Sequence, residues 1–236
     1  NSVIVLKDTK ADNFSSIKAA SALHNTDNLD LNIKRYVMGV AYSEVGIFVQ
    51  YEGLAKAEMI AAKSFIIGRI AQGGGIGTMG MSYEYDTIDG KTVFYLRGNE
   101  IDQDFCDIYE GCETGRYSKT NITSGASQAR VNKKPPLKNE LGEEAVSNLE
   151  KWYDEVINEF VLDDNSKSFY GAQLNNTNNN LEFCPIGSCL FQEPAMDAGK
   201  EGATYEEILF DMSYTDKRYT LYDVSTDNIS VVTKIC

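Results

Sequence analysis

The sequence has a single histidine, His24, and this scarcity excludes several kinds of active site. A Ser-His-Asp triad, a two-histidine zinc site and an HExxH metalloprotease each need histidine at a defined position. His24 lies in the polar stretch HNTDNLDLN, which is typical of an exposed loop. We therefore expect no histidine-based catalysis by this chain.

The sequence also lacks long apolar runs and an excess of positive charge. No run of about 18 apolar residues exists, so no segment is expected to span a membrane. No signal peptide is recognisable, and the first residue is Asn1, so we expect an anchor or signal in a segment absent from this sequence. The net charge of −13 argues against nucleic acid as a partner, because that partner needs a cationic surface.

The glycine-rich stretch AQGGGIGTMGMS, at residues 71–82, does not match a nucleotide-binding loop. A phosphate loop needs GxxxxGK[ST] between a strand and a helix, and no lysine follows these glycines. The stretch is typical of a helix stop and a flexible turn. We expect no cofactor.

Five cysteines fall into two close pairs and one terminal residue: Cys106, Cys112, Cys184, Cys189 and Cys236. Short-loop disulfides outside the cytosol are one interpretation. A four-cysteine zinc site is another, although the spacings are wider than in the usual CxxC knuckle. Buried free thiols are the third, and spacing alone leaves the three open.

Residues 36–70 are the stretch around which the chain is organised. The segment 36–42 is uncharged, and Glu44 follows it. Residues 52–69 then repeat apolar side chains at spacings of three and four, which predicts a helix that is apolar on most sides. A carboxylate next to such a helix is partly desolvated, which raises its pKa and suits it to general-acid chemistry. An ion pair of Glu44 with Lys34, Arg35 or Lys56 that holds the fold is the alternative.

Two adjacent motifs match one known family. Residues 36–44 read YVMGVAYSE against the family pattern YVxGVxxxEM, with Val45 in place of the methionine. Residues 56–65 read KAEMIAAKSF against the helix KAQAxAARTY. On these residues the chain resembles the stage II sporulation protein D family, over residues 25–215.

The resemblance implies a cell-wall remodelling protein that acts outside the cytoplasm during engulfment in endospore-forming bacteria. Better-studied members resemble lytic transglycosylases of peptidoglycan, and the Glu of the first pattern is their catalytic acid. Glu44 inherits that role by position, and Tyr36 is an expected substrate contact. The implied partners are peptidoglycan glycan strands and other membrane-anchored cell-wall hydrolases. The chain would itself be membrane-anchored or secreted.

The closing signature of the family, GHGVGMSQYGAxxMAKQGxxYEEIL, resembles CPIGSCLFQEPAMDAGKEGATYEEIL at residues 184–209. Gly187 and Gln192 keep the pattern and are expected substrate contacts, whereas Ile186 replaces its histidine.

The segment 106–112 resembles a family segment with two cysteines that hold zinc, in some members, together with neighbouring histidines. No histidine is present here, so we expect no metal. The resemblance favours the disulfides Cys106–Cys112 and Cys184–Cys189 instead.

The rest of the sequence predicts a single α+β domain over residues 1–236, with a mixed or antiparallel sheet around the central apolar helix and with loop insertions. Helices are also expected at 14–24, 140–159 and 204–211, the last with Thr204 as its N-cap and Glu207 at the third helical position. The expected strands are at 2–6, in hairpins at 83–97 and around 163–167, and near the C-terminus.

A lytic transglycosylase needs one carboxylate as acid and then as base, so a single Glu44 suits this scheme. The competing hypothesis is a non-catalytic peptidoglycan-binding or amidase-enhancing protein on the same fold. Departures from the family pattern at the closing signature favour that alternative.

Overall fold

Helices and short strands both build the fold in the computed structural model, which describes residues 2–7, 29–71, 83–88, 91–97, 106–111, 134–171, 173–174 and 187–225. This mixture confirms the predicted α+β class. The expected helix at 14–24 lies outside the described residues, as does the part of the C-terminal region after residue 225.

The stretch 36–70 folds as two helices joined by a short 3-10 helix. Helix α2 spans Leu29–Val45, η1 spans Gly46–Gln50, and α3 spans Glu52–Ala71. The sequence leaves strand or helix open for residues 36–42, and the structure makes them helical. Gly46 ends α2 because it has φ +58°, a left-handed conformation that glycine adopts without steric cost.

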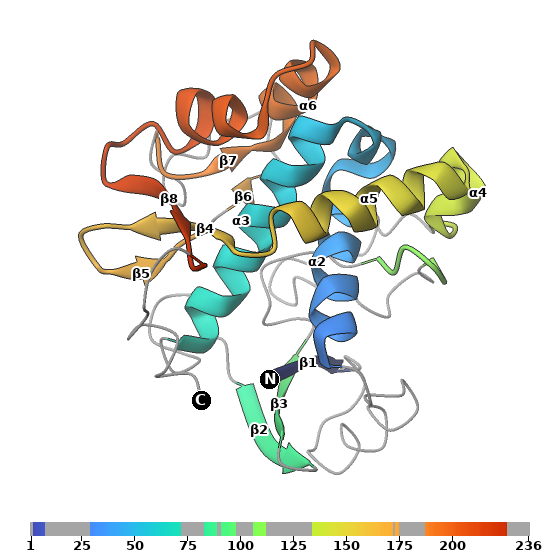
Figure 1. The fold of residues 1–236 in the computed structure, drawn as a ribbon, viewed down its shortest axis with the longest axis vertical. Helices are drawn as coiled ribbons and strands as arrows, with labels where there is room; N and C mark the ends of the chain where they lie inside the picture. The colour runs from blue at the N-terminus through green and yellow to red at the C-terminus, as the bar shows by residue number, and fades with distance from the viewer. Residues whose placement is uncertain are drawn as a thin grey trace, which may run out of the picture.

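Helix α3 is the most deeply buried element of the described chain. Residues 54–64 are all buried, and α3 contacts α2, α5, α6, η1, η3, β4 and β5. Glycine permits this close packing at both ends of the helix. A Cβ on Gly53 would lie 2.0 Å from the carbonyl oxygen of Ala203, and one on Gly68 would lie 2.1 Å from that of Phe169. Figure 1 shows α3 running diagonally through the fold, with α5 crossing it.

The single helix expected at 140–159 is in fact two shorter helices. Helix α4 spans Leu137–Leu141 and α5 spans Glu143–Glu155. Gly142 separates them with φ +87° and donates its N–H to the carbonyl oxygen of Lys138, which closes α4. The predicted apolar face is confirmed at Leu149 and Trp152, which are buried against the core.

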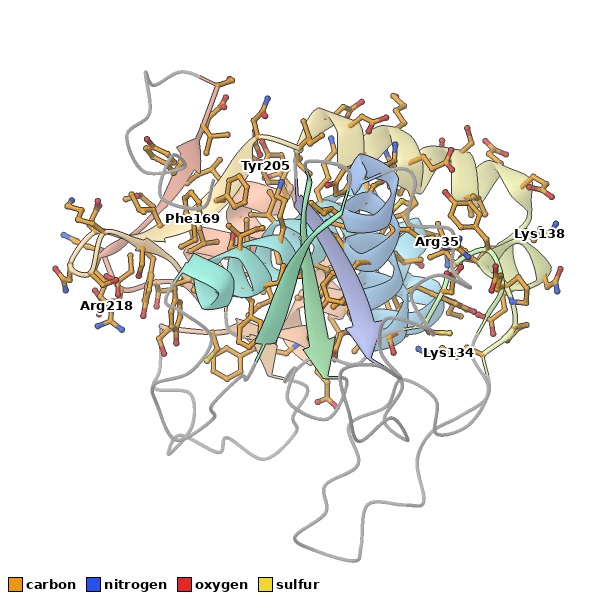
Figure 2. The ribbon with its side chains drawn as sticks, turned by 90° about the horizontal axis from the view of Figure 1, so that it is seen from below. Arg35, Lys134, Lys138, Phe169, Tyr205 and Arg218 are labelled. Carbon is orange, nitrogen blue, oxygen red and sulfur yellow. The ribbon has the colours of Figure 1, made fainter. Side chains whose placement is uncertain are left out.

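Two three-stranded sheets and one two-stranded sheet are present among the described residues. Strand β1 (Ser2–Lys7) pairs in parallel with β3 (Lys91–Arg97), and β2 (Tyr83–Ile88) pairs antiparallel with β3. The register places Ile88 opposite Lys91, so the predicted hairpin with a two-residue connection is confirmed. Figure 2 shows these three strands side by side across one face of the molecule.

The second sheet has the order β5-β4-β8 and is antiparallel throughout. It comprises β4 (Glu159–Asp163), β5 (Ser168–Phe169) and β8 (Tyr219–Asp223). The turn at 164–167 agrees with the predicted hairpin. Strands β6 (Gln173–Leu174) and β7 (Leu190–Phe191) form a short parallel pair.

The segment after β7 contains one helix that was not predicted and one that differs from its prediction. Residues 192–200, for which no helix was predicted, form helix α6, Gln192–Lys200. The helix expected at 204–211 begins as predicted, because Thr204 Oγ1 accepts the N–H of Glu207 while Glu207 Oε2 accepts the N–H of Thr204. It then widens into a π-helix, η3, over Glu207–Ser213. Helix α6 and η3 lie together at one end of the fold (Figure 1).

Within the described residues, no helix has the length and apolar character needed to cross a membrane.

Candidate functional site

Glu44, the expected catalytic residue, lies in the last turn of α2 and is half-buried. The C-terminal end of a helix carries a partial negative charge from its unpaired carbonyl groups. This charge disfavours the carboxylate form of Glu44, and partial burial acts in the same direction. The Lys134 ammonium, which binds two carbonyl groups at this helix end, opposes both effects.

Lys134 holds the end of α2 that carries Glu44. Its Nζ donates to the carbonyl oxygens of Tyr42, at 2.9 Å, and Ser43, at 2.5 Å. It also lies 5.2 Å from the centre of the Tyr42 ring. These bonds satisfy two carbonyl groups that the helix cannot satisfy itself. Lys134 is not among the predicted site residues.

Tyr42 fixes the same segment from the other side. Its hydroxyl donates to the carbonyl oxygen of Pro135 or to Glu140 Oε2, each at 2.8 Å. Burial, followed by the hydrogen bond and charge of Glu140, raises the pKa of the Tyr42 phenol well above its ordinary value. The phenol therefore stays neutral and the helix end is held by fixed contacts. Figure 2 shows Lys134 and Lys138 on the same side of the molecule as Arg35.

Gln192 reaches Glu44 from the other end of the sequence. Its Nε2 donates to Glu44 Oε2 at 3.0 Å, across 148 residues of chain. Gln192 is the first residue of α6 and is fully buried, with 0% of its surface exposed. Two residues that the sequence analysis selected from separate motifs are therefore in direct contact.

Tyr36 also lies in the electrostatic field of Glu44. It is on α2, two turns before Glu44, and it is buried. Burial first, and the charge of Glu44 second, raise the pKa of the Tyr36 phenol far above its ordinary value. Tyr36 therefore stays a neutral phenol.

The structure places the third expected contact, Gly187, in a tight turn. Gly187 has φ +80°, and its carbonyl oxygen accepts the N–H of Asp216. A Cβ there would lie 2.7 Å from Thr215 Oγ1. Among the described residues these contacts join Gly187 to the segment after η3, and none joins it to Glu44.

The three bases that could have paired with Glu44 bind other carboxylates. Lys34 binds Asp154 at 2.7 Å, and Lys56 binds Glu52 and Glu155, each at 2.6 Å. Arg35 binds Asp107 at 2.5 Å and Glu110 at 2.9 Å. Each of these three bases therefore has a carboxylate partner other than Glu44.

Cys106 and Cys189 are both disulfide-bonded. Their expected partners, Cys112 and Cys184, lie outside the described residues, so the two pairings remain predictions. Within the described part of the chain, no group of three or more His, Cys, Asp or Glu side chains is placed to hold a metal ion.

Two adjoining surface hollows of about 440 and 450 Å³ lie over α6 and η3. Both are lined by Ala198, Glu201 and Met212, and neither is lined by Glu44. A groove at Glu44, which a glycan-cleaving role would require, therefore stays a prediction.

Comparison with known proteins returned no match: no family model, no curated protein and no solved structure matches this chain.

The buried amine of Lys63, on α3, provides a pH-dependent test of the packing. Lys63 Nζ donates to the carbonyl oxygens of Val156, at 2.5 Å, and Ile157, at 2.8 Å, and lies 4.6 Å from the centre of the Phe160 ring. Burial lowers the pKa of Lys63 from 10.5 to about 7, against the smaller opposing effects of Glu159 and Asp223.

We expect Lys63 to make the free energy of unfolding rise with pH between about 7 and 10. In that window the unfolded chain keeps a proton on this amine whereas the folded chain releases it, so the unfolded state binds more protons. The slope is at most about 1.4 kcal/mol per pH unit. Urea unfolding of the wild type and of Lys63→Met across this range measures it, since the variant lacks the titrating amine. A stability difference that does not change with pH would show that the ammonium stays charged in the folded protein.

Proposed function

We propose that this protein cleaves the glycan strands of peptidoglycan in the manner of a lytic transglycosylase, with Glu44 as its acid and base. The observation that supports this most is the 3.0 Å hydrogen bond between Gln192 Nε2 and Glu44 Oε2. The resemblance to the stage II sporulation protein D family selected these two residues from separate motifs. A contact between them is what a shared site requires.

In the proposed reaction the protonated Glu44 carboxyl donates its proton to the glycosidic oxygen, and the bond from that oxygen to the anomeric carbon breaks. The resulting Glu44 carboxylate then takes the proton of the 6-hydroxyl of the same sugar. The oxygen of that 6-hydroxyl bonds to the anomeric carbon and closes an anhydro ring. Glu44 ends protonated, so one carboxylate completes the cycle without a water molecule.

The surroundings of Glu44 favour this use. Partial burial of Glu44 favours the protonated form that begins the reaction, and the side-chain amide of Gln192 hydrogen-bonds the Glu44 carboxyl group. Lys134 keeps the helix end in place through its bonds to Tyr42 and Ser43.

The proposal includes a cellular location, a biological process and the domain that carries the site. The disulfides at Cys106 and Cys189 support a place outside the cytoplasm, where disulfides persist. We place the activity in cell-wall remodelling during engulfment, with glycan strands and other membrane-anchored cell-wall hydrolases as partners. One α+β domain over residues 1–236, with α3 at its centre, would carry the site.

A non-catalytic peptidoglycan-binding or amidase-enhancing role is the second candidate. The burial of Tyr36 and Gln192 favours it, because neither side chain is exposed for a direct contact with a glycan. In the catalytic proposal we assign both residues to the environment of Glu44.

Incubation with purified glycan strands, with and without stem peptides, separates the two candidates. We expect soluble fragments with anhydro ends, detected by mass spectrometry after chromatography. Co-sedimentation of the protein with the strands and no release of fragments would overturn the catalytic proposal in favour of binding.

A further inference from the structure

The side-chain amide of Gln192 is buried and only half satisfied. Its Nε2 donates to Glu44, but its Oε1 is buried and has no hydrogen-bond partner among the described residues. A buried amide oxygen without a partner costs stability, so such groups are uncommon in proteins. This one lies beside the carboxylate of the proposed site, which suggests a functional reason for it.

The unpartnered oxygen leaves the amide free to turn. Rotation of the terminal amide by half a turn exchanges the positions of Oε1 and Nε2, which have nearly the same shape. With Nε2 toward Glu44, the amide donates to a carboxylate. With Oε1 toward Glu44, it accepts from a protonated carboxyl. No second hydrogen bond within the described residues fixes either orientation.

The backbone that carries this amide is held firmly, so the rotation needs no movement of α6. Buried Ala195, Ala198 and Gly199 pack the helix inward. At Gly199 an added Cβ would lie 2.8 Å from Leu54 Cβ on α3. Helix α6 also contacts α2, which carries Glu44.

We propose that Gln192 is a positioning residue that follows the protonation state of Glu44 by rotating its amide, donating to the carboxylate and accepting from the acid. This inference rests on the proposed function, in which one carboxylate serves as acid and then as base. A lysine or arginine could bind only the carboxylate and would hold Glu44 in that form. A glutamine binds both forms and keeps the carboxyl in one position through both proton transfers.

Gln192→Met tests the proposal, because methionine has a similar length and no polar group. We expect unchanged or higher thermal stability, since a half-satisfied buried amide is replaced by an apolar side chain. We expect the rate of glycan release to fall at least tenfold at every pH, because both forms of Glu44 lose their partner. Gln50→Met, at an exposed position of η1, is the matched control and should retain full activity and stability. A Gln192→Met variant with wild-type release would overturn the proposal.

The decisive readout is the titration of the Glu44 carboxyl carbon by NMR, made without glycan and assigned by its loss in Glu44→Gln. If the amide serves both forms, Gln192→Met leaves the titration midpoint nearly unchanged. If Gln192 is a fixed donor, it stabilises only the carboxylate, and its removal raises the midpoint by about one pH unit or more. That shift would overturn the proposal.

The two proteins share every group around Glu44 except the side chain at position 192, so the difference between the two titrations reports the replacement of Gln192. Tyr36 does not titrate in this range, because burial raises its pKa far above its ordinary value. An unchanged midpoint in a protein that releases no fragments would refute the catalytic proposal alone. The proton-dependent rotation of Gln192 would then stand as a property of the folded protein.

Discussion

Replacing Glu44 with glutamine is expected to lower the rate of glycan release by roughly 10²–10⁴-fold, the usual contribution of a general acid. Glutamine keeps the shape of the side chain and can still hydrogen-bond Gln192, but it has no proton to transfer. Thermal stability should stay nearly unchanged, because glutamine keeps the size of the side chain and its contact with Gln192. Release from purified strands and thermal unfolding measure the two effects on the same preparation.

Glu144→Gln is the matched control for this substitution. Glu144 is exposed in the first turn of α5, so the same chemical change there should alter neither activity nor stability appreciably. A loss of roughly 3 kcal/mol or more in Glu44→Gln would instead identify Glu44 as a member of a buried ion pair. The substitution thus separates the catalytic interpretation from the structural one.

Ile60→Ala is expected to lower the free energy of unfolding by about 2–5 kcal/mol, a large part of the stability of a typical domain. Ile60 is completely buried in the middle of α3. Its truncation leaves a cavity in a helix that contacts α2, α5 and α6, and these neighbours cannot all close on it. Equilibrium unfolding in urea measures the loss.

The chain provides its own control for that experiment. Ile47, in η1, is 45% exposed, so Ile47→Ala removes the same atoms at a site that is already in contact with water. We expect a change within about 0.5 kcal/mol there. Equal losses of unfolding free energy at the two positions would show that Ile60 is not buried in the core.

Local sequence patterns predicted the elements whose side-chain period is strong. The α3 helix follows from spacings of three and four, and the hairpin of β2 and β3 follows from alternation around a two-residue turn. Helix α6 was missed because Pro194 and Gly199 usually mark loops. Pro194 lies in the first turn, where proline is tolerated, and Gly199 lies where Leu54 leaves no room for a side chain.

Within the candidate site, only the residues that belong to a sequence motif could be predicted. Glu44 and Gln192 were chosen from separate motifs, and the structure brings them into contact. Lys134 has no local signal of its role, because its bonds to Tyr42 and Ser43 join segments about 90 residues apart and exist only in the folded chain. The position of Gly187 relative to Glu44 also depends on tertiary packing, and its contacts are with Thr215 and Asp216.

The most direct test of the proposed mechanism is the identity of the new chain ends formed in water labelled with heavy oxygen. If Glu44 acts first as acid and then as base toward the 6-hydroxyl of the sugar, every new end is an anhydro ring that carries no label. Mass spectrometry of the released fragments reads this outcome without any assumption about rate. Reducing ends that carry the label would show that water attacks the anomeric carbon, which would contradict the single-carboxylate mechanism.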